Sequence, residues 1–156
     1  MTQITYLKGD ATNPMTKGNK IIAHICNDVG AWGKGFVLAI SKKWKEPEKA
    51  YKKWYKDNNN FERGEVQLIP VADYISVCNM IGQEGIRTGA KGVPIRYEAV
   101  ESCLEKLCEM AKEQQASIHM PRIGCGLAGG KWEIIEPIIK KTLIDNGIEV
   151  YVYDFD

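Results

Sequence analysis

The sequence predicts one α/β domain, a three-layer α/β/α sandwich with a mixed, mostly parallel sheet of about six strands. Its length of 156 residues is that of a single domain and is enough to bury a core. Short apolar runs alternate with segments of helical periodicity, which is typical of helices covering both faces of a sheet. Hydrophobic residues make up 44% and charged residues 26%, a composition that excludes a disordered chain.

The first sixty residues predict two strands followed by two helices. Residues 4–8 form a short run of strand-forming residues that ends at a glycine, and a glycine typically ends a strand. Residues 20–26 are rich in isoleucine, which is typical of a strand in the middle of a sheet. After a glycine-rich turn, residues 36–44 predict a helix. Pro47 opens a second helix, because its missing N–H is harmless in a first turn, and three asparagines at 58–60 end it.

The middle of the chain predicts two neighbouring strands and a long helix. Residues 66–70 and 74–81 are apolar runs of strand length. A polar, glycine-containing loop follows them. From residue 95 to 115, apolar side chains recur at steps of three and four, which predicts a helix with one buried face.

The last forty residues predict a strand, a helix and a final strand. Residues 117–121 form a short strand that leads directly into a second glycine-rich segment. The helix after it begins near residue 132 and ends at 146–147, an Asn-Gly pair typical of a helix C-terminus. Pro137 predicts a kink or a later start of this helix. Residues 149–153 form the last strand.

Charge and cysteine content exclude several classes of protein. Lys and Arg total 21 and Asp and Glu total 20, so the chain lacks the basic surface that a long nucleic acid requires. No apolar run reaches about 18 residues, so we expect no membrane span. The first residues do not resemble a signal peptide, and the five cysteines follow no disulfide or zinc spacing. We therefore expect a cytoplasmic monomer without a metal or cofactor.

Two segments, residues 25–36 and 120–130, share one pattern of buried strand, glycine-rich loop and helix start. Glycines let backbone N–H groups approach an anion, and a helix start adds the positive end of its dipole. Either loop alone is also consistent with a tight turn that needs positive φ. At the same sheet edge, the pair predicts a ligand with two linked phosphates. The candidate ligand-binding residues of the two loops are Gly30, Trp32, Gly33, Lys34, Gly35, Phe36, Pro121, Ile123, Gly124, Cys125, Gly126, Leu127 and Ala128.

The second loop also matches Gly-x-Gly-x-x-Gly at Gly124, Gly126 and Gly129, the fingerprint of dinucleotide-binding domains. Only one helix and one strand follow it, whereas a Rossmann domain places this motif in its first βαβ unit. An NAD-dependent oxidoreductase is therefore disfavoured.

Several residues near the strand ends have both a binding and a structural interpretation. Asp10, after Gly9, can accept a hydrogen bond from an adenine amine or stabilise a turn. Asn27 can bind a sugar hydroxyl or cap the next turn. His24, in the middle of a strand, is either a catalyst or a core histidine. Trp32 either covers a ligand or packs on the adjacent helix.

The end of the chain places aromatic side chains at alternate positions. Tyr153 and Phe155 therefore share one face of the last strand and can sandwich a base, or can simply pack against the sheet edge.

These motifs resemble those of a macrodomain, the module that binds ADP-ribose. The resemblance spans nearly the whole chain and rests on residues 4–10, 23–27, 33–36 and 120–127, with 150–153 as a closing strand. Commoner macrodomains carry Asn-Ala-Ala-Asn where this sequence has residues 24–27, His-Ile-Cys-Asn. That variant resembles the branch of ADP-ribose-1''-phosphate phosphatases and hydrolases of ester-linked ADP-ribose.

The resemblance implies a role for each candidate residue. Asp10, with the backbone of Ala11, would bind the adenine amine. Asn27 would face the distal ribose, and Tyr153 and Phe155 would flank the adenine. Backbone N–H groups would hold the phosphates, from Gly33, Lys34 and Gly35 in the first loop and from residues 124–128 in the second.

The sequence departs from this branch at its catalytic positions. Some members use an aspartate after Gly-Cys-Gly-Leu, where this chain has Ala128. They also use a lysine whose best match here is Gln83-Glu84, with Lys91 offset in the same loop. A covalent lysine route is therefore disfavoured. A water oriented by the phosphates and by His24 or Asn27 is the simpler route, and His24 is the first catalytic candidate.

Two functions follow from this reasoning. One is an enzyme that hydrolyses ADP-ribose-1''-phosphate, O-acyl-ADP-ribose or ester-linked protein ADP-ribose. The other is a non-catalytic module that reads ADP-ribose, free or on an ADP-ribosylated protein. Ala128 favours the reader, whereas the single-domain length favours the enzyme.

Overall fold

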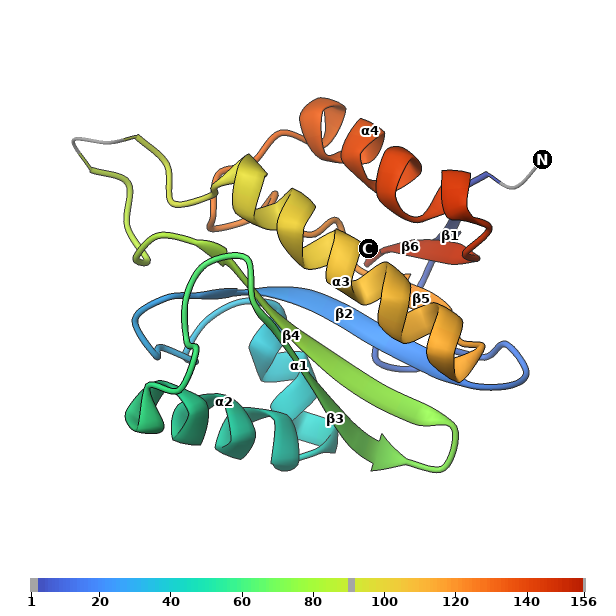
Figure 1. The fold of residues 1–156 in the computed structure, drawn as a ribbon, viewed down its shortest axis with the longest axis horizontal. Helices are drawn as coiled ribbons and strands as arrows, with labels where there is room; N and C mark the ends of the chain where they lie inside the picture. Colours follow the sequence, from blue (N-terminus) through green and yellow to red (C-terminus); the bar gives the residue numbers. More distant parts are fainter. Residues whose placement is uncertain (1–2, 90–91, 156) are drawn as a thin grey trace.

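The computed structural model describes residues 3–89 and 92–155, and its six strands form one sheet in the order β1-β6-β5-β2-β4-β3 (Figure 1). The strands are β1 (Thr5–Lys8), β2 (Lys20–Asn27), β3 (Val66–Ala72), β4 (Ile75–Gln83), β5 (Ser117–Met120) and β6 (Val150–Asp154). The helices are α1 (Phe36–Lys43), α2 (Glu46–Asp57), α3 (Tyr97–Gln114), α4 (Trp132–Thr142) and the 3₁₀ turn η1 (Ile144–Asn146). Among the described strand pairs, only β3 with β4 is antiparallel, so the predicted mixed, mostly parallel sheet is confirmed.

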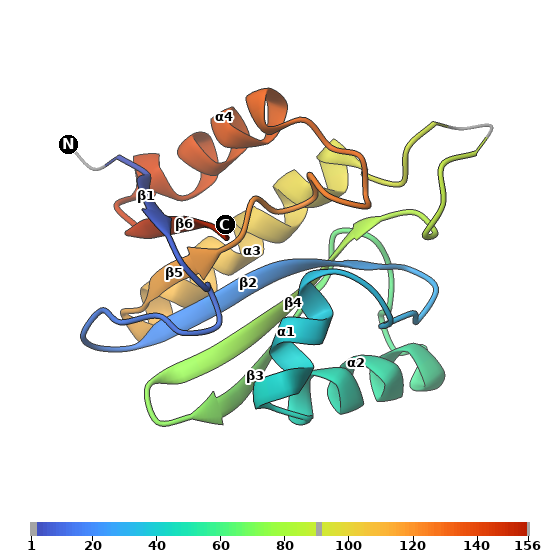
Figure 2. The same ribbon diagram turned by 180° about the vertical axis from the view of Figure 1, so that it is seen from behind.

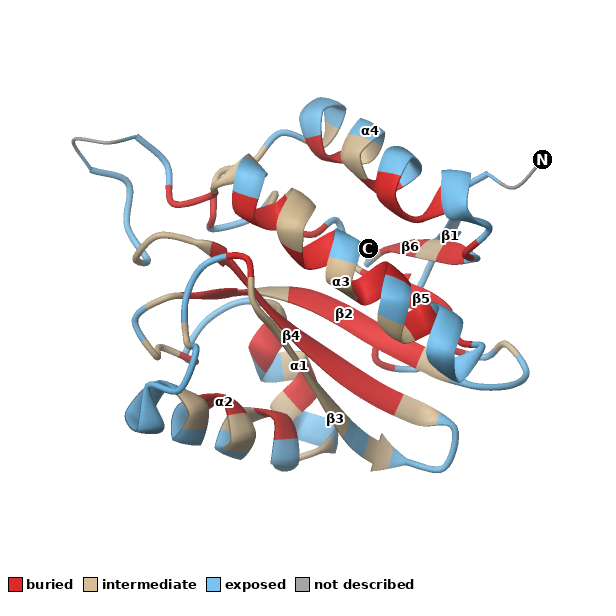
Figure 3. Ribbon diagram, viewed as in Figure 1, coloured by how far each residue is buried: buried red, intermediate tan, exposed pale blue. Residues whose placement is uncertain are grey.

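Helices cover both faces of the sheet, as predicted (Figures 1 and 2). Helices α3 and α4 cover one face, and α1 and α2 cover the other. Successive side chains of β2 point to opposite faces. Ile21 and Ala23 therefore join the core beneath α3 and α4, and Ile22 and Cys26 join the core beneath α1 and α2. Figure 3 shows that most of β2 and all but the two ends of β4 are buried.

Several element boundaries differ from the sequence prediction; β3, for example, runs to Ala72 and not only to residue 70. Helix α4 begins at Trp132 and continues through Pro137, then ends at Thr142 and is followed by η1. Gly147, at φ 81°, closes that turn, so the predicted Asn-Gly stop ends a 3₁₀ turn rather than the α-helix. Strand β4 also runs two residues beyond the prediction, to Gln83, which pairs with Asn27 across a register shift.

The parallel strands end at one edge of the sheet, and the glycine-rich segments leave from that edge. Gly9 follows β1 and donates its backbone N–H to the carbonyl of Asp154 on β6, 3.0 Å away. The two loops predicted to hold phosphates follow the neighbouring strands β2 and β5. Ligands of open α/β sheets bind at this edge. In the described part of the chain, no helix is long and apolar enough to cross a bilayer.

Candidate functional site

A cleft in two adjoining parts lies at this edge of the sheet. The wide part has a volume of about 730 Å³ and the narrow part about 250 Å³. Phe36 and Pro121 line both parts and so mark the junction between them. Together the two volumes lie in the range of small-molecule sites. The wide part is lined by Gly9, Asp10, Ala11, Thr12, Phe36, Leu38, Ala39, Lys42, Lys43, Pro121, Tyr153 and Phe155. The narrow part is lined by His24, Ile25, Lys34, Gly35, Phe36, Val37, Gln83, Pro121, Arg122, Ile123, Gly124, Gly126, Leu127 and Ala128.

Asp10 is held at the inner wall of the wide part by a tight turn. One carboxylate oxygen, Oδ1, accepts hydrogen bonds from the backbone N–H and the hydroxyl of Thr12, at 2.8 and 2.7 Å. Lys43 on α1 donates to the carbonyl of Thr12 at 2.7 Å, which ties this turn to the opposite wall. The second carboxylate oxygen, Oδ2, takes no part in these two hydrogen bonds.

Two aromatic side chains from the end of the chain complete the wide part, as the alternation predicted. Tyr153 is buried, and its hydroxyl lies 2.8 Å from Nδ1 of His119, which fixes the ring. Phe155 is 80% exposed and lies at the rim. One ring is therefore held in place, and the other is exposed at the rim of the cleft.

The fold requires glycine at some positions of the two loops and not at others. Gly35 and Gly124 adopt φ angles of 84° and 72°, which other residues rarely adopt. A Cβ on Gly130 would lie 2.5 Å from the carbonyl oxygen of Gly124. Gly33 and Gly126, by contrast, have no such φ and no atom within 4 Å of a built Cβ. The fold does not require glycine at these two positions, and Gly126 leaves open space beside its own backbone in the narrow part.

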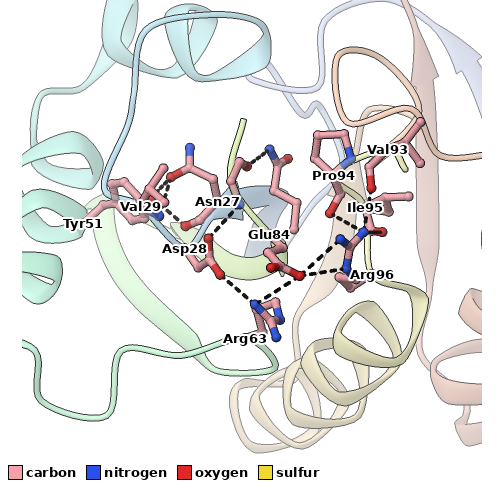
Figure 4. Close-up of polar contacts among 12 residues, drawn as sticks. Asn27, Asp28, Val29, Tyr51, Arg63, Glu84, Val93, Pro94, Ile95 and Arg96 are labelled. Atoms are coloured by element: carbon pink, nitrogen blue, oxygen red, sulfur yellow. Dashed lines mark hydrogen bonds and ion pairs between the residues drawn. The ribbon is translucent and has the colours of Figure 1, made fainter. Parts of the chain in front are cut away.

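Asn27 shapes the first loop rather than facing the cleft. Its Oδ1 accepts from the backbone N–H groups of Val29 and Ala31, at 3.0 and 3.1 Å, and lies 2.8 Å from the Tyr51 hydroxyl. Figure 4 shows Asn27 beside Val29 and Tyr51. Its Nδ2 donates to the carbonyl of Ala31 at 2.8 Å. The sequence left open whether Asn27 binds a sugar hydroxyl or caps the next turn. The geometry matches the cap. A ribose contact by Asn27 is a prediction that this arrangement does not favour, because its amide is already engaged.

Trp32 packs inward as a hydrophobic plug. It is 7% exposed, its Nε1 donates to Ser41 at 2.7 Å, and its ring contacts Tyr51 and His24. Neither part of the cleft is lined by Trp32, so the interpretation in which it covers a ligand is not what the structure shows. The first loop is thus anchored to the core behind it.

His24 lies at the back of the narrow part, with 1% of its surface exposed. Its Nε2 lies 2.6 Å from Oδ1 of Asn79. Burial lowers the pKa of this imidazole to about 4, and the hydrogen bond to Asn79 opposes that shift. The ring is therefore neutral at pH 7. At that pH it can accept a hydrogen bond, but it is not an imidazolium that could donate a proton.

A network of charged side chains joins the loops beside the narrow part (Figure 4). Arg63 lies 2.8 Å from Oδ2 of Asp28 and 3.7 Å from Glu84, and Arg96 lies 3.1 Å from Glu84. Oδ1 of Asp28 accepts from the backbone N–H of Gly85 at 2.8 Å. Both carboxylates are therefore paired with arginine instead of pointing at a reacting group.

Gln83, next to Glu84, lines the narrow part and donates through Nε2 to the carbonyl of Gly85 at 2.9 Å. An amide cannot act as the nucleophile that a lysine would supply. Lys91, the offset alternative, lies outside the described residues. Ala128 is buried in the wall of the narrow part and brings no carboxylate there.

The structure thus brings most of the predicted ligand residues to one cleft. The exceptions are Asn27, at the end of β2, and Gly30, Trp32, Gly33 and Cys125, in the two loops; none of them lines the cleft. Gly30 is pressed against Tyr55, whose ring would lie 2.4 Å from an added Cβ. Asn27 and Trp32 anchor the first loop through their hydrogen bonds with Ala31 and Ser41.

Sequence reasoning missed a wall of the wide part formed by one face of α1. Leu38, Ala39, Lys42 and Lys43 follow each other at helical spacing after the first loop, a signal that could have indicated a ligand-facing side. It also missed Arg122, which forms a bidentate pair with Asp154 at 2.6 and 3.0 Å. That pair ties the second loop to β6.

Comparison with known families and curated proteins gives a consistent result. The family model described as Macro domain matches residues 23–139. Chromodomain-helicase-DNA-binding protein 1-like of Mus musculus is 33% identical over 99% of this chain, although the chain spans only 18% of that protein's length. ADP-ribose 1''-phosphate phosphatase of Candida albicans is 24% identical over 88% of this chain and 92% of its own length.

Solved structures share the whole fold. A protein of unknown function from Bacteroides thetaiotaomicron is 57% identical with a TM-score of 0.97, covering 98% of both chains. A macrodomain protein from Streptomyces coelicolor is 50% identical with a TM-score of 0.88, covering 97% of this chain and 99% of its own. Thermosipho africanus DarTG in complex with ADP-ribose, at 19% identity and TM-score 0.70, covers 87% of this chain and 38% of its own and shares the fold.

Proposed function

The chain belongs to the Macro domain family, and on that basis we propose that it binds ADP-ribose and hydrolyses a derivative substituted on the distal ribose. The proposed substrates are ADP-ribose-1''-phosphate, O-acyl-ADP-ribose and ester-linked protein ADP-ribose. The observation that carries the proposal is the cleft itself. Its narrow part is bounded by two glycine-rich loops, and its wide part offers a fixed carboxylate beside two aromatic rings.

In this proposal the adenosine half of the ligand occupies the wide part. Oδ2 of Asp10 accepts a hydrogen bond from the exocyclic amine of adenine, and Tyr153 and Phe155 flank the base. The diphosphate crosses the junction at Phe36 and Pro121 and meets backbone N–H groups of both loops. The distal ribose then enters the narrow part, close to His24 and Gln83.

The proposed reaction is a direct attack of water on C1'' of the distal ribose. A bond forms between the water oxygen and C1'', and the bond from C1'' to the phosphate or carboxylate breaks. The leaving group keeps the electron pair, and the water proton passes to a phosphate oxygen of the ligand. Nδ1 of His24 and Oε1 of Gln83 are the acceptors proposed to orient the water. No lysine adduct is invoked, because the matching positions carry Gln83 and an arginine-bound Glu84.

A non-catalytic reader of ADP-ribose is the second candidate, and two observations favour it. Ala128 supplies no carboxylate, and the pKa of His24 lies at about 4, well below the pH at which a general base works best. Under this alternative the same cleft binds the same ligand without turnover.

The test is a calorimetric titration with ADP-ribose, NAD and AMP, followed by a phosphate-release assay on ADP-ribose-1''-phosphate. Binding of ADP-ribose in preference to NAD supports the proposed ligand, and phosphate release that is lost in His24→Ala supports the enzyme. Binding without release by the wild-type protein supports the reader. The absence of ADP-ribose binding would refute both.

A further inference from the structure

A chain of buried amides lies behind the narrow part of the cleft. His24 on β2 stands opposite Asn79 on β4, and both side chains are buried, with 1% and 0% of their surfaces exposed. Nδ2 of Asn79 donates to Oε1 of Gln67 on β3 and to the carbonyl of Pro47 on α2, each at 3.1 Å. Nε2 of Gln67 in turn donates to the carbonyl of Ala50 at 3.0 Å.

The backbone carbonyls at the far end of this chain fix the direction of every bond in it. The carbonyls of Pro47 and Ala50 can only accept, so the amide nitrogens of Asn79 and Gln67 must face them. Oδ1 of Asn79 then faces His24, and it is also only an acceptor. Nε2 of His24 must therefore carry the proton, and Nδ1 of the neutral ring is left as a lone pair.

That lone pair has no partner in the described part of the chain. Among the described side chains, Nδ1 of His24 is the buried nitrogen or oxygen atom that makes no hydrogen bond. Buried polar groups are almost always paired, so an unpaired acceptor calls for an explanation. The ring stands edge-on to Trp32 at 5.4 Å and tilted to Phe36 at 6.0 Å, and Phe36 lines both parts of the cleft.

We propose that Asn79 and Gln67 are positioning residues that lock His24 in one tautomer, so that Nδ1 accepts a hydrogen bond from an O–H group at the distal end of the ligand. The donor is a hydroxyl of the distal ribose or a water held beside it. This inference rests on the proposed function, because the ligand brings the donor. The inference adds Asn79 on β4 and Gln67 on β3, which position His24 on β2, to the residues that line the cleft.

The neighbours of His24 do not disturb this state. Cys26, on the same strand, places its Sγ 3.9 Å from Nε2, and Tyr51 on α2 packs behind Trp32. Burial raises the pKa of both the Cys26 thiol and the Tyr51 hydroxyl, so both groups are neutral. Phe36 on α1 and Asn79 on β4 do not titrate. The acceptor therefore persists over the physiological pH range.

The first experiment reads the tautomer directly. Long-range ¹H–¹⁵N correlation spectra of protein labelled with ¹⁵N-histidine contain signals from two histidines, and His119→Gln assigns them. We expect the Nε2–H tautomer for His24 in the free protein at pH 7. An Nδ1–H ring would overturn the lock, whatever the protein binds.

The same spectra, recorded with ligands, test the acceptor. ADP-ribose is expected to shift Nδ1 of His24 to lower frequency, as an accepted hydrogen bond does, and AMP, which lacks the distal ribose, is not. A shift with ADP as well identifies an ordered water as the donor, and a shift with ADP-ribose alone identifies a ribose hydroxyl. If ADP-ribose binds by calorimetry and Nδ1 does not respond, the inference fails while the proposed function stands. If ADP-ribose does not bind, both fail.

A substitution tests the positioning role. Asn79→Leu removes the acceptor that faces Nε2 and keeps a similar volume. We expect the Nδ1–H tautomer to become detectable. Turnover should fall by about 10- to 100-fold, the size seen when the hydrogen-bond partner that orients a metal-ligating histidine is lost. AMP affinity should not change, because AMP does not reach His24. A loss of AMP and ADP-ribose affinity in equal measure would indicate a merely structural role and overturn the assignment. The wild-type spectra decide the tautomer even if this variant does not fold.

Discussion

Glutamate at position 126 is expected to abolish ADP-ribose binding and to leave the fold intact. Gly126 lines the narrow part of the cleft in the second loop. Its φ angle is not in the left-handed region, and no atom lies within 4 Å of a Cβ built there. A side chain at this position therefore strains neither the backbone nor a neighbour, and its carboxylate enters the space proposed for the diphosphate.

The size of the effect follows from Coulomb's law. Two like charges about 5 Å apart, in an environment with an effective dielectric constant of about 20, repel each other by about 3 kcal/mol. Since 1.4 kcal/mol corresponds to a factor of ten, one such pair weakens binding by roughly 100-fold or more. The diphosphate carries two charges, so this value is a lower bound for the electrostatic part.

Calorimetry with ADP-ribose measures the loss of affinity, and thermal unfolding checks the fold. Gly126→Gln separates volume from charge, because it adds almost the same side chain without the carboxylate. Gly89→Glu is the matched control outside the cleft, since Gly89 also has open space at a built Cβ. A dissociation constant for Gly126→Glu within about threefold of the wild-type value would refute the placement of the diphosphate beside the second loop.

Three further outcomes are expected. Asp10→Ala should weaken ADP-ribose by about 1–3 kcal/mol, the usual cost of losing a hydrogen bond to a charged group, and should not affect ribose 5-phosphate. An equal loss for both ligands in calorimetry would contradict the adenine contact. Tyr51→Phe removes the hydroxyl that lies 2.6 Å from the carbonyl of Asn27 and should destabilise the protein by about 1 kcal/mol in urea unfolding, whereas an unchanged midpoint would show that the bond is not needed. His24 and His119 both have a pKa lowered by burial to about 4, so between pH 6.5 and 4 the unfolded chain binds protons that the folded chain does not. Each histidine should therefore lower the free energy of unfolding by about 3 kcal/mol as the pH falls from 6.5 to 4, and should have no effect above pH 6.5. A free energy of unfolding that stays constant between pH 7 and 4.5 would contradict the burial of these histidines.

Local patterns in the sequence were sufficient for the order of elements and for most of the cleft. The isoleucine run of β2 predicted a central strand, and the glycines after β2 and β5 predicted the two loops, because strand ends and turns depend on neighbouring residues. Asp10 and Tyr153 were found from their positions at the ends of β1 and in β6. These features follow from the topology of a parallel sheet.

The direction in which side chains point could not be predicted in the same way. Trp32 and Asn27 had two interpretations each, and the choice depends on Ser41 and Tyr51, which come from later helices. The partner of His24 is 55 residues away in the sequence. Contacts between residues this far apart in the sequence are set by tertiary packing. The periodicity of the sequence gives no information about them.

The junction at Phe36 and Pro121 makes the cleft a bivalent site. A molecule that fills one part brings any group attached to it into the other at a high effective concentration, and the second contact then needs no further loss of translational freedom. In the proposed binding mode, AMP and ribose 5-phosphate each occupy one part of the cleft and gain nothing from this linkage. The two-part cleft therefore favours a ligand whose two halves remain linked over either half alone. Two modest contact surfaces then give selectivity for the linked molecule.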